Sequence, residues 1–139
     1  MSAASNYTED RTLDFWLKAN SQSSTAPATV YVALFTSDDS TGATSDNLEA
    51  GTITNEVSGG SYARQSVAFG TISNGSVSNS ANLTFPTATA NWGTITHVAI
   101  MDASTSGNVL FYGALDTARE ILTDDTFQIT TGNLTVTLA

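Results

Sequence analysis

The pattern of hydrophobic and polar positions in this 139-residue chain is mostly that of β-strands. Two segments, 29–36 (TVYVALFT) and 94–101 (TITHVAIM), are apolar on both faces, which predicts central strands with both sides buried. Segments 62–69 and 76–85 alternate between apolar and polar residues, as half-buried strands do. Residues 109–115 follow a predicted hairpin loop and supply the partner strand of 94–101.

The end of the chain predicts one more pair of strands. Segments 127–130 and 133–138 are rich in β-formers and are separated by Gly132, which suits a turn between them. About seven short strands separated by turn signals are typical of an all-β protein. We therefore predict a β-sandwich with one short N-terminal α-helix, and a small barrel is the alternative.

The predicted helix lies near the N-terminus. Thr8 suits the N-cap position, and two acidic residues follow it in the first turn, where the helix dipole favours them. Leu13, Trp16 and Leu17 have the i, i+3, i+4 spacing of one apolar helix face. The pattern predicts a short amphipathic helix that ends before the Ser/Thr-rich run at 21–25.

Two segments fall outside this pattern of strands and helix. Residues 1–7 are polar and are interpreted as an N-terminal arm, and residues 37–55 as a long, exposed acidic loop. The chain length is that of one domain, so we expect residues 1–139 to share a single core.

Charge and composition exclude several classes of protein. The formal net charge is −9, with four Lys and Arg against thirteen Asp and Glu, which argues against nucleic acid and against anionic membranes as partners. The chain has no cysteine, so disulfides and zinc–thiolate sites are excluded. It shows neither a signal-peptide pattern nor an apolar run long enough for a membrane span, which suggests synthesis in a cytoplasm.

Candidate chemistry is sparse. The single histidine, His97, lies in an apolar strand without a second histidine or a cysteine to share a metal, and its predicted role is structural. Asp38, Asp46 and Glu49 supply oxygen ligands of the kind Ca²⁺ prefers, but without EF-hand spacing, so a solvated acidic loop is preferred. We predict no catalytic, cofactor-binding or metal-binding residues, no cofactor, and a protein that is not an enzyme.

Several aromatic residues allow a further interpretation. Tyr62, Trp92, Phe111 and Tyr112 together suit a platform on which sugar rings stack, but their positions in or beside strands favour packing in the core. Arg64 shares a strand face with Tyr62, two residues away. As one of four basic residues, it is expected to pair with an acid such as Asp102 or with an acid of a neighbouring subunit.

Three stretches, 56–70, 79–103 and 106–115, carry the motifs YAR at 62–64 and WG at 92–93. They resemble a family of small tailed-bacteriophage virion structural proteins, which are labelled as tail-fibre proteins or as capsid cement (decoration) proteins. The order of an N-terminal helix, a strand like TVYVALFT and a G-x-L-x-V-T-L ending at 132–138 is also similar. The resemblance covers most of the chain and implies a structural role in a phage particle.

From this resemblance we expect a capsid cement protein that binds the major capsid protein on the outer head surface and stabilises it. It would be made in the cytoplasm of the host bacterium and would act in the virion as a homo-oligomer, with a trimer favoured. A tail or tail-fibre component is the alternative, and a carbohydrate-binding β-sandwich module is a further one. Tyr62, Arg64, Trp92 and Asp102 are the candidate structural or interface residues.

Overall fold

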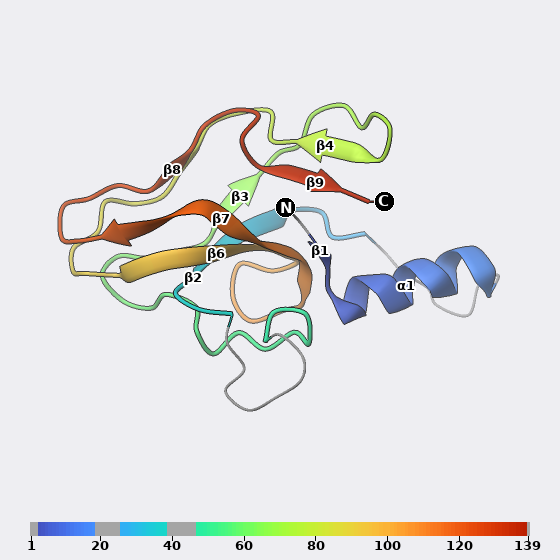
Figure 1. The fold of residues 1–139 in the computed structure, drawn as a ribbon, viewed down its shortest axis with the longest axis horizontal. Coiled ribbons are helices and arrows are strands. Elements are labelled where there is room, and N and C mark those ends of the chain that lie inside the picture. Colours follow the sequence, from blue (N-terminus) through green and yellow to red (C-terminus); the bar gives the residue numbers. More distant parts are fainter. Residues whose placement is uncertain (1–2, 19–25, 39–46, 139) are drawn as a thin grey trace.

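The computed structural model of the protein describes residues 3–18, 26–38 and 47–138. They form two layers of strands with an α-helix beside them (Figure 1). The helix is α1 (Asn6–Leu17), and the strands are β1 (Ala3–Ala4), β2 (Val30–Phe35), β3 (Gln65–Val67), β4 (Ser76–Ser78), β5 (Leu83–Thr84), β6 (Gly93–Met101), β7 (Val109–Ile121), β8 (Gln128–Ile129) and β9 (Thr135–Thr137). The predicted fold class, a sandwich-like all-β fold with one short helix, is confirmed.

The larger layer is a five-stranded antiparallel sheet in the order β1-β7-β6-β2-β3. Its middle strands are the two segments predicted to be buried on both sides, and their register places Leu34 opposite Val98. Val32 and Leu34 point to one face of the sheet while Ala33 and Phe35 point to the other, and all four are fully buried. Strand β2 is apolar throughout because each face of the sheet has its own core.

The smaller layer is a ribbon in which β4 pairs with β9 and β5 pairs with β8. The prediction that the last two strands pair with each other around Gly132 is wrong. Gly132 does lie in a turn, with a φ of +83° and a 3.1 Å bond from the Asn133 N–H to the Thr130 carbonyl. The chain does not fold back there, because the Asn79 side chain accepts from the Leu134 N–H at 2.9 Å and ties this segment to the earlier strands.

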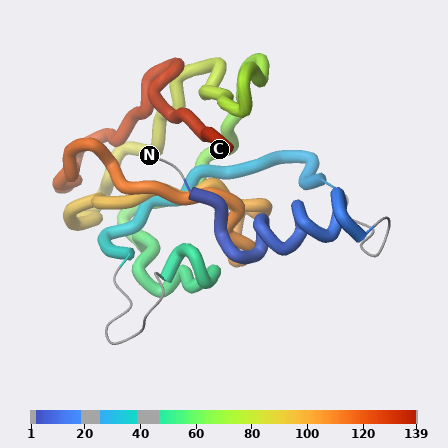
Figure 2. The backbone as a smooth tube through the Cα atoms, turned by 45° about the vertical axis from the view of Figure 1, so that its right-hand side comes forward, coloured from blue at the N-terminus to red at the C-terminus, as the bar shows by residue number. Residues whose placement is uncertain are grey.

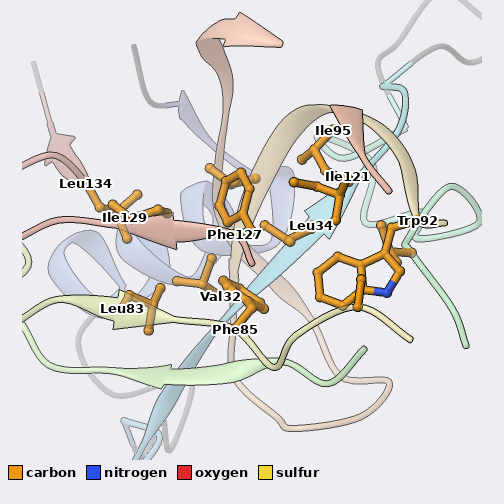
Figure 3. Close-up of a cluster of buried hydrophobic side chains, with 13 residues drawn as sticks. Val32, Leu34, Leu83, Phe85, Trp92, Ile95, Ile121, Phe127, Ile129 and Leu134 are labelled. Atoms are coloured by element: carbon orange, nitrogen blue, oxygen red, sulfur yellow. The ribbon is translucent and has the colours of Figure 1, made fainter. Parts of the chain in front are cut away.

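The main core lies between the two layers (Figure 3). Phe85 and Phe127 meet edge-to-face at its centre, with ring centroids 5.6 Å apart. Burying each such side chain contributes roughly 1.5–3 kcal/mol to stability. The buried members of this core are Val32, Leu34, Val57, Leu83, Phe85, Ala88, Trp92, Ile95, Val98, Ile121, Phe127, Ile129 and Leu134.

The opposite face of the large sheet is covered by the second half of the predicted acidic loop. Leu48 is fully buried against Phe35 and Met101, and Ile53 packs beside them. The Leu48 N–H donates to the Asp38 carboxylate at 2.8 Å, which links the two ends of the loop. Residues 39–46, the rest of that loop, lie outside the described residues.

The two layers are joined along one side by the chain that follows β3. Phe69 bridges to Asn79, and the Ser80 N–H donates to the Ala68 carbonyl at 2.9 Å. Main-chain hydrogen bonding therefore continues from the sheet into the ribbon at this side. The ribbon and β7 meet differently on the other side, where they border a groove.

Candidate functional site

The first candidate site is a buried ion pair between Arg64 and Glu56. The Arg64 Nε donates to Glu56 Oε1 and Nη2 donates to Oε2, both at 2.8 Å, so the pair is bidentate. The two side chains are only 3% and 15% exposed. Arg64 Nη1 also donates to the carbonyls of Ala103 and Ser106, at 2.8 and 2.7 Å. These bonds fasten the hairpin loop between β6 and β7 to the segment before β3.

The hydrogen bonds to Glu56 raise the pKa of the Arg64 guanidinium further above its usual value. The predicted partner, Asp102, is used elsewhere: its carboxylate accepts from the Asn108 N–H at 2.7 Å and from the Asn108 side-chain amide at 2.8 Å. Asp102 therefore closes its own hairpin loop, and Glu56 is the acid that pairs with Arg64.

Tyr62 completes this polar cluster. Its hydroxyl donates to Glu56 Oε1 at 2.9 Å and accepts from the Leu34 N–H of β2 at 3.0 Å. Burial raises the pKa of the Tyr62 phenol far above its ordinary value. The ring stacks on Phe85 and meets Trp92 edge-to-face, with centroids 6.2 and 5.5 Å away. Tyr62 thus connects the main core to the ion pair.

Trp92 is a buried anchor of the turn at Gly59 and Gly60. Its indole Nε1 donates to the Gly60 carbonyl at 2.8 Å, and 6% of the residue is exposed. Both glycines have positive φ, and a Cβ on Gly60 would come within 2.9 Å of Trp92 Nε1. The structure places Tyr62, Arg64 and Trp92 in one cluster within the subunit, and a role at an interface stays a prediction for them and for Asp102.

The other candidate residues, His97 and the proposed calcium ligands, do not form a site among the described residues. His97 Nδ1 lies 2.8 Å from the Thr96 hydroxyl. Of the proposed calcium ligands, Asp46 lies outside the described residues, and Asp38 binds the main chain at Leu48. Within the described ranges no group of three His, Asp or Glu side chains is arranged to hold a metal ion, and no helix there is long and apolar enough to cross a membrane.

The second candidate site is the helix α1, which begins earlier than predicted. Ser5, not Thr8, is the N-cap, and its hydroxyl accepts from the Thr8 N–H at 3.3 Å. Ser5 is fully buried: its N–H donates to the Leu110 carbonyl at 3.0 Å and its hydroxyl to the Val109 carbonyl. Within the predicted arm at 1–7, β1 pairs with β7, and α1 starts at Asn6.

Beyond this anchored start, α1 extends away from the strand layers (Figure 2). None of its described residues is buried. The predicted apolar stripe of Leu13, Trp16 and Leu17 is 56%, 74% and 74% exposed, and Phe15, outside that stripe, is 59% exposed. The Phe15 and Trp16 rings meet edge-to-face, with centroids 5.2 Å apart. The helix therefore presents a cluster of large apolar side chains, which we call the helix tip.

The third candidate site is a groove of about 930 Å³ between β7 and segment 125–136 of the ribbon. Core residues such as Ile129 and Leu134 form its floor, and Asp116, Arg119 and Glu120 stand on its β7 side. No pattern in the sequence predicts it, because it arises from two segments that are adjacent only in the folded protein.

These features define a small β-sandwich protein with an exposed apolar helix and a groove between its two layers. The family model of the podophage GP4 fiber I protein gp80 matches residues 3–137, nearly the whole chain, and the protein belongs to this family. No curated protein matches the chain. The resemblance seen in the sequence is confirmed, and its tail-fibre label agrees with the family description.

Proposed function

We propose that the protein is a structural subunit of a phage tail fibre and that it self-associates through the helix tip. The family description names a fibre protein, which supports the fibre over the cement protein expected on the capsid surface. The observation that carries the assembly is the exposure of Leu13, Phe15, Trp16 and Leu17 on one short helix. An enzyme is not proposed, since the polar cluster is directed into the fold.

The size of the helix tip suits an assembly of several copies. An aromatic side chain buries roughly 150–250 Å² when it is fully covered, so Phe15 and Trp16 at their present exposure offer roughly 200–330 Å². With the two leucines this is about half of the ~800 Å² that each partner contributes to a standard interface. A trimer, in which every helix contacts two neighbours, makes fuller use of this area than a pair does.

The carbohydrate-binding alternative receives less support from the geometry. Trp92 is nearly buried and bonded to Gly60, and Tyr62 packs between core rings. Neither side chain presents a free face on which a sugar ring could stack.

Size-exclusion chromatography with light scattering tests the assembly. We expect the wild-type protein to form an oligomer and the Trp16→Glu/Leu17→Glu variant to be a folded monomer. Ile72→Glu is the control, because Ile72 is 74% exposed like Trp16 but lies in the loop between β3 and β4. A wild-type monomer at high concentration, or an oligomer that the helix variant leaves intact, contradicts the proposal.

The position in the virion needs a separate test. Antibodies against this protein should label the tail fibres of intact particles in immunogold electron microscopy. Label over the heads would overturn the fibre assignment in favour of the cement function, whichever oligomer forms in solution.

A further inference from the structure

The groove between β7 and the ribbon is bordered by strand edges that lack a partner strand. Strand β7 pairs with β6 on one side, and on its other side β1 pairs only with Phe111 and Tyr112 among the described residues. Strands β8 and β9 each have a partner on one side alone in the described part of the chain. Unpaired strand edges of this kind are where an additional strand adds to a sheet.

The middle of β7 is further separated from its neighbour by a bulge. Between the pairs Ile95–Arg119 and His97–Ala114 the register shifts, so residues 115–118 have no partner residue in β6. Three of them, Leu115, Asp116 and Thr117, line the groove. The main-chain groups of residues 115–118 therefore take no part in a regular ladder with β6.

The floor and the rim of the groove differ in chemistry. Ile129, Leu134 and Val136 of the floor belong to core segments and are almost fully buried, so their small exposed faces are apolar. The residues that line the groove include three acids, Asp116, Glu120 and Asp125, and one base, Arg119. The Asp125 carboxylate also accepts from the Leu122 N–H at 2.9 Å. A strand whose side chains alternate between apolar and basic would place one set on the floor and the other beside the acidic rim.

We propose that this groove binds an extended segment of another protein, added as a strand along residues 113–120 and carrying apolar and basic residues at alternate positions. A second copy of this chain is not the source, because its four basic residues, at 11, 18, 64 and 119, are far apart in the sequence. The inference goes beyond the proposed function and does not depend on the helix tip, which lies on α1.

The probe is a seven-residue peptide of alternating lysine and valine with blocked ends. Two control peptides are the same composition with all lysines before all valines, and an alternating glutamate–valine peptide. We expect calorimetry at physiological salt to show that the alternating lysine peptide binds roughly tenfold more tightly than either control. Methylation of alternate peptide nitrogens, which removes main-chain donors, should abolish the binding.

The location of binding is tested by charge reversal and by hydrogen exchange. Asp116→Lys/Glu120→Lys should weaken the alternating lysine peptide by roughly tenfold. The control Glu9→Lys/Asp10→Lys makes the same change of charge on α1 and should leave the affinity within about twofold, since salt screens distant charges. Bound peptide should slow amide exchange at 113–120.

Four results would overturn the inference: no binding of the alternating lysine peptide, equal binding of the block-order peptide, equal loss in both charge variants, or unchanged exchange at 113–120. Protection of 113–120 that increases with protein concentration in the absence of peptide would also overturn it, by showing that a second copy occupies the groove. None of these results concerns the helix tip, so the proposed self-assembly is judged separately.

Discussion

Replacing Arg64 by methionine tests how much of the fold depends on the buried ion pair. Arg64→Met keeps the unbranched apolar stem of the side chain but removes the guanidinium and its five donors. The Glu56 carboxylate then loses its cation, and the carbonyls of Ala103 and Ser106 lose the bonds that Nη1 makes at 2.8 and 2.7 Å. The segment before β3 is released from the β6–β7 hairpin loop.

Breaking a buried ion pair from one side costs about 3–5 kcal/mol, because an uncompensated charge is left inside. Glu56 is 15% exposed and keeps the bond from the Tyr62 hydroxyl, so we expect the lower end, about 3 kcal/mol. Arg64→Lys keeps the charge but not the bidentate fork, and about 1–2 kcal/mol is expected. The double variant Glu56→Gln/Arg64→Met leaves no buried charge and should be more stable than the two single losses predict when added.

Urea denaturation followed by circular dichroism provides the measurement. With a denaturant slope of about 2 kcal/mol/M, a loss of 3 kcal/mol lowers the midpoint by roughly 1.5 M. Asp102→Asn, which alters the partner predicted from the sequence, should leave the effect of Arg64→Met unchanged. A loss below about 1 kcal/mol in Arg64→Met, or strictly additive losses in the double variant, would refute the reasoning.

Two further predictions concern Tyr62 and Gly60. Burial raises the pKa of Tyr62 above its ordinary 10.0, so the folded state holds this proton more tightly than the unfolded state, and stability is complete below pH 10 and falls as the pH rises above it. The free energy of unfolding should fall by up to about 1.4 kcal/mol per pH unit above pH 10. The Tyr62→Phe variant should lack this slope. An equal slope in both proteins would exclude Tyr62 as the cause. Gly60→Ala should cost about 1–3 kcal/mol more than Gly132→Ala in thermal melts. Both glycines have positive φ, but only at Gly60 does a new Cβ meet Trp92 Nε1 and the Ala90 carbonyl, at 2.9 and 3.0 Å. Equal losses of stability in the two variants would show that this contact is relieved at little cost.

The parts of the fold that the sequence predicts are those set by local pattern. The runs at 29–36 and 94–101 contain too many consecutive apolar residues for an exposed strand, and they form β2 and β6. The start of α1 was predicted three residues too late because Ser5 and Thr8 are both good caps, and only the buried carbonyls of Val109 and Leu110 favour Ser5.

The parts that could not be predicted depend on partners distant in the chain. The last two strands each suit a hairpin around Gly132, yet both pair with residues more than forty positions earlier. The sequence does not determine which acid pairs with Arg64. Glu56 takes this position because the Tyr62 hydroxyl bonds to its carboxylate and is itself held by the β2 main chain. The groove combines segments from β7 and the ribbon, so it has no signal in either segment alone.

Because α1 is anchored at Ser5, a small change in orientation there becomes a large displacement at the other end of the helix. The twelve residues of α1 extend roughly 18 Å from Ser5. Four hydrogen bonds hold Ser5 in place, two of them to carbonyls of β7. A tilt of the helix axis by about 10° at Ser5 displaces the far end of α1 by roughly 3 Å, which is more than half the spacing between adjacent helical turns. In the proposed assembly, the buried serine would set the angle at which one subunit meets the next, and small errors there would accumulate along a fibre.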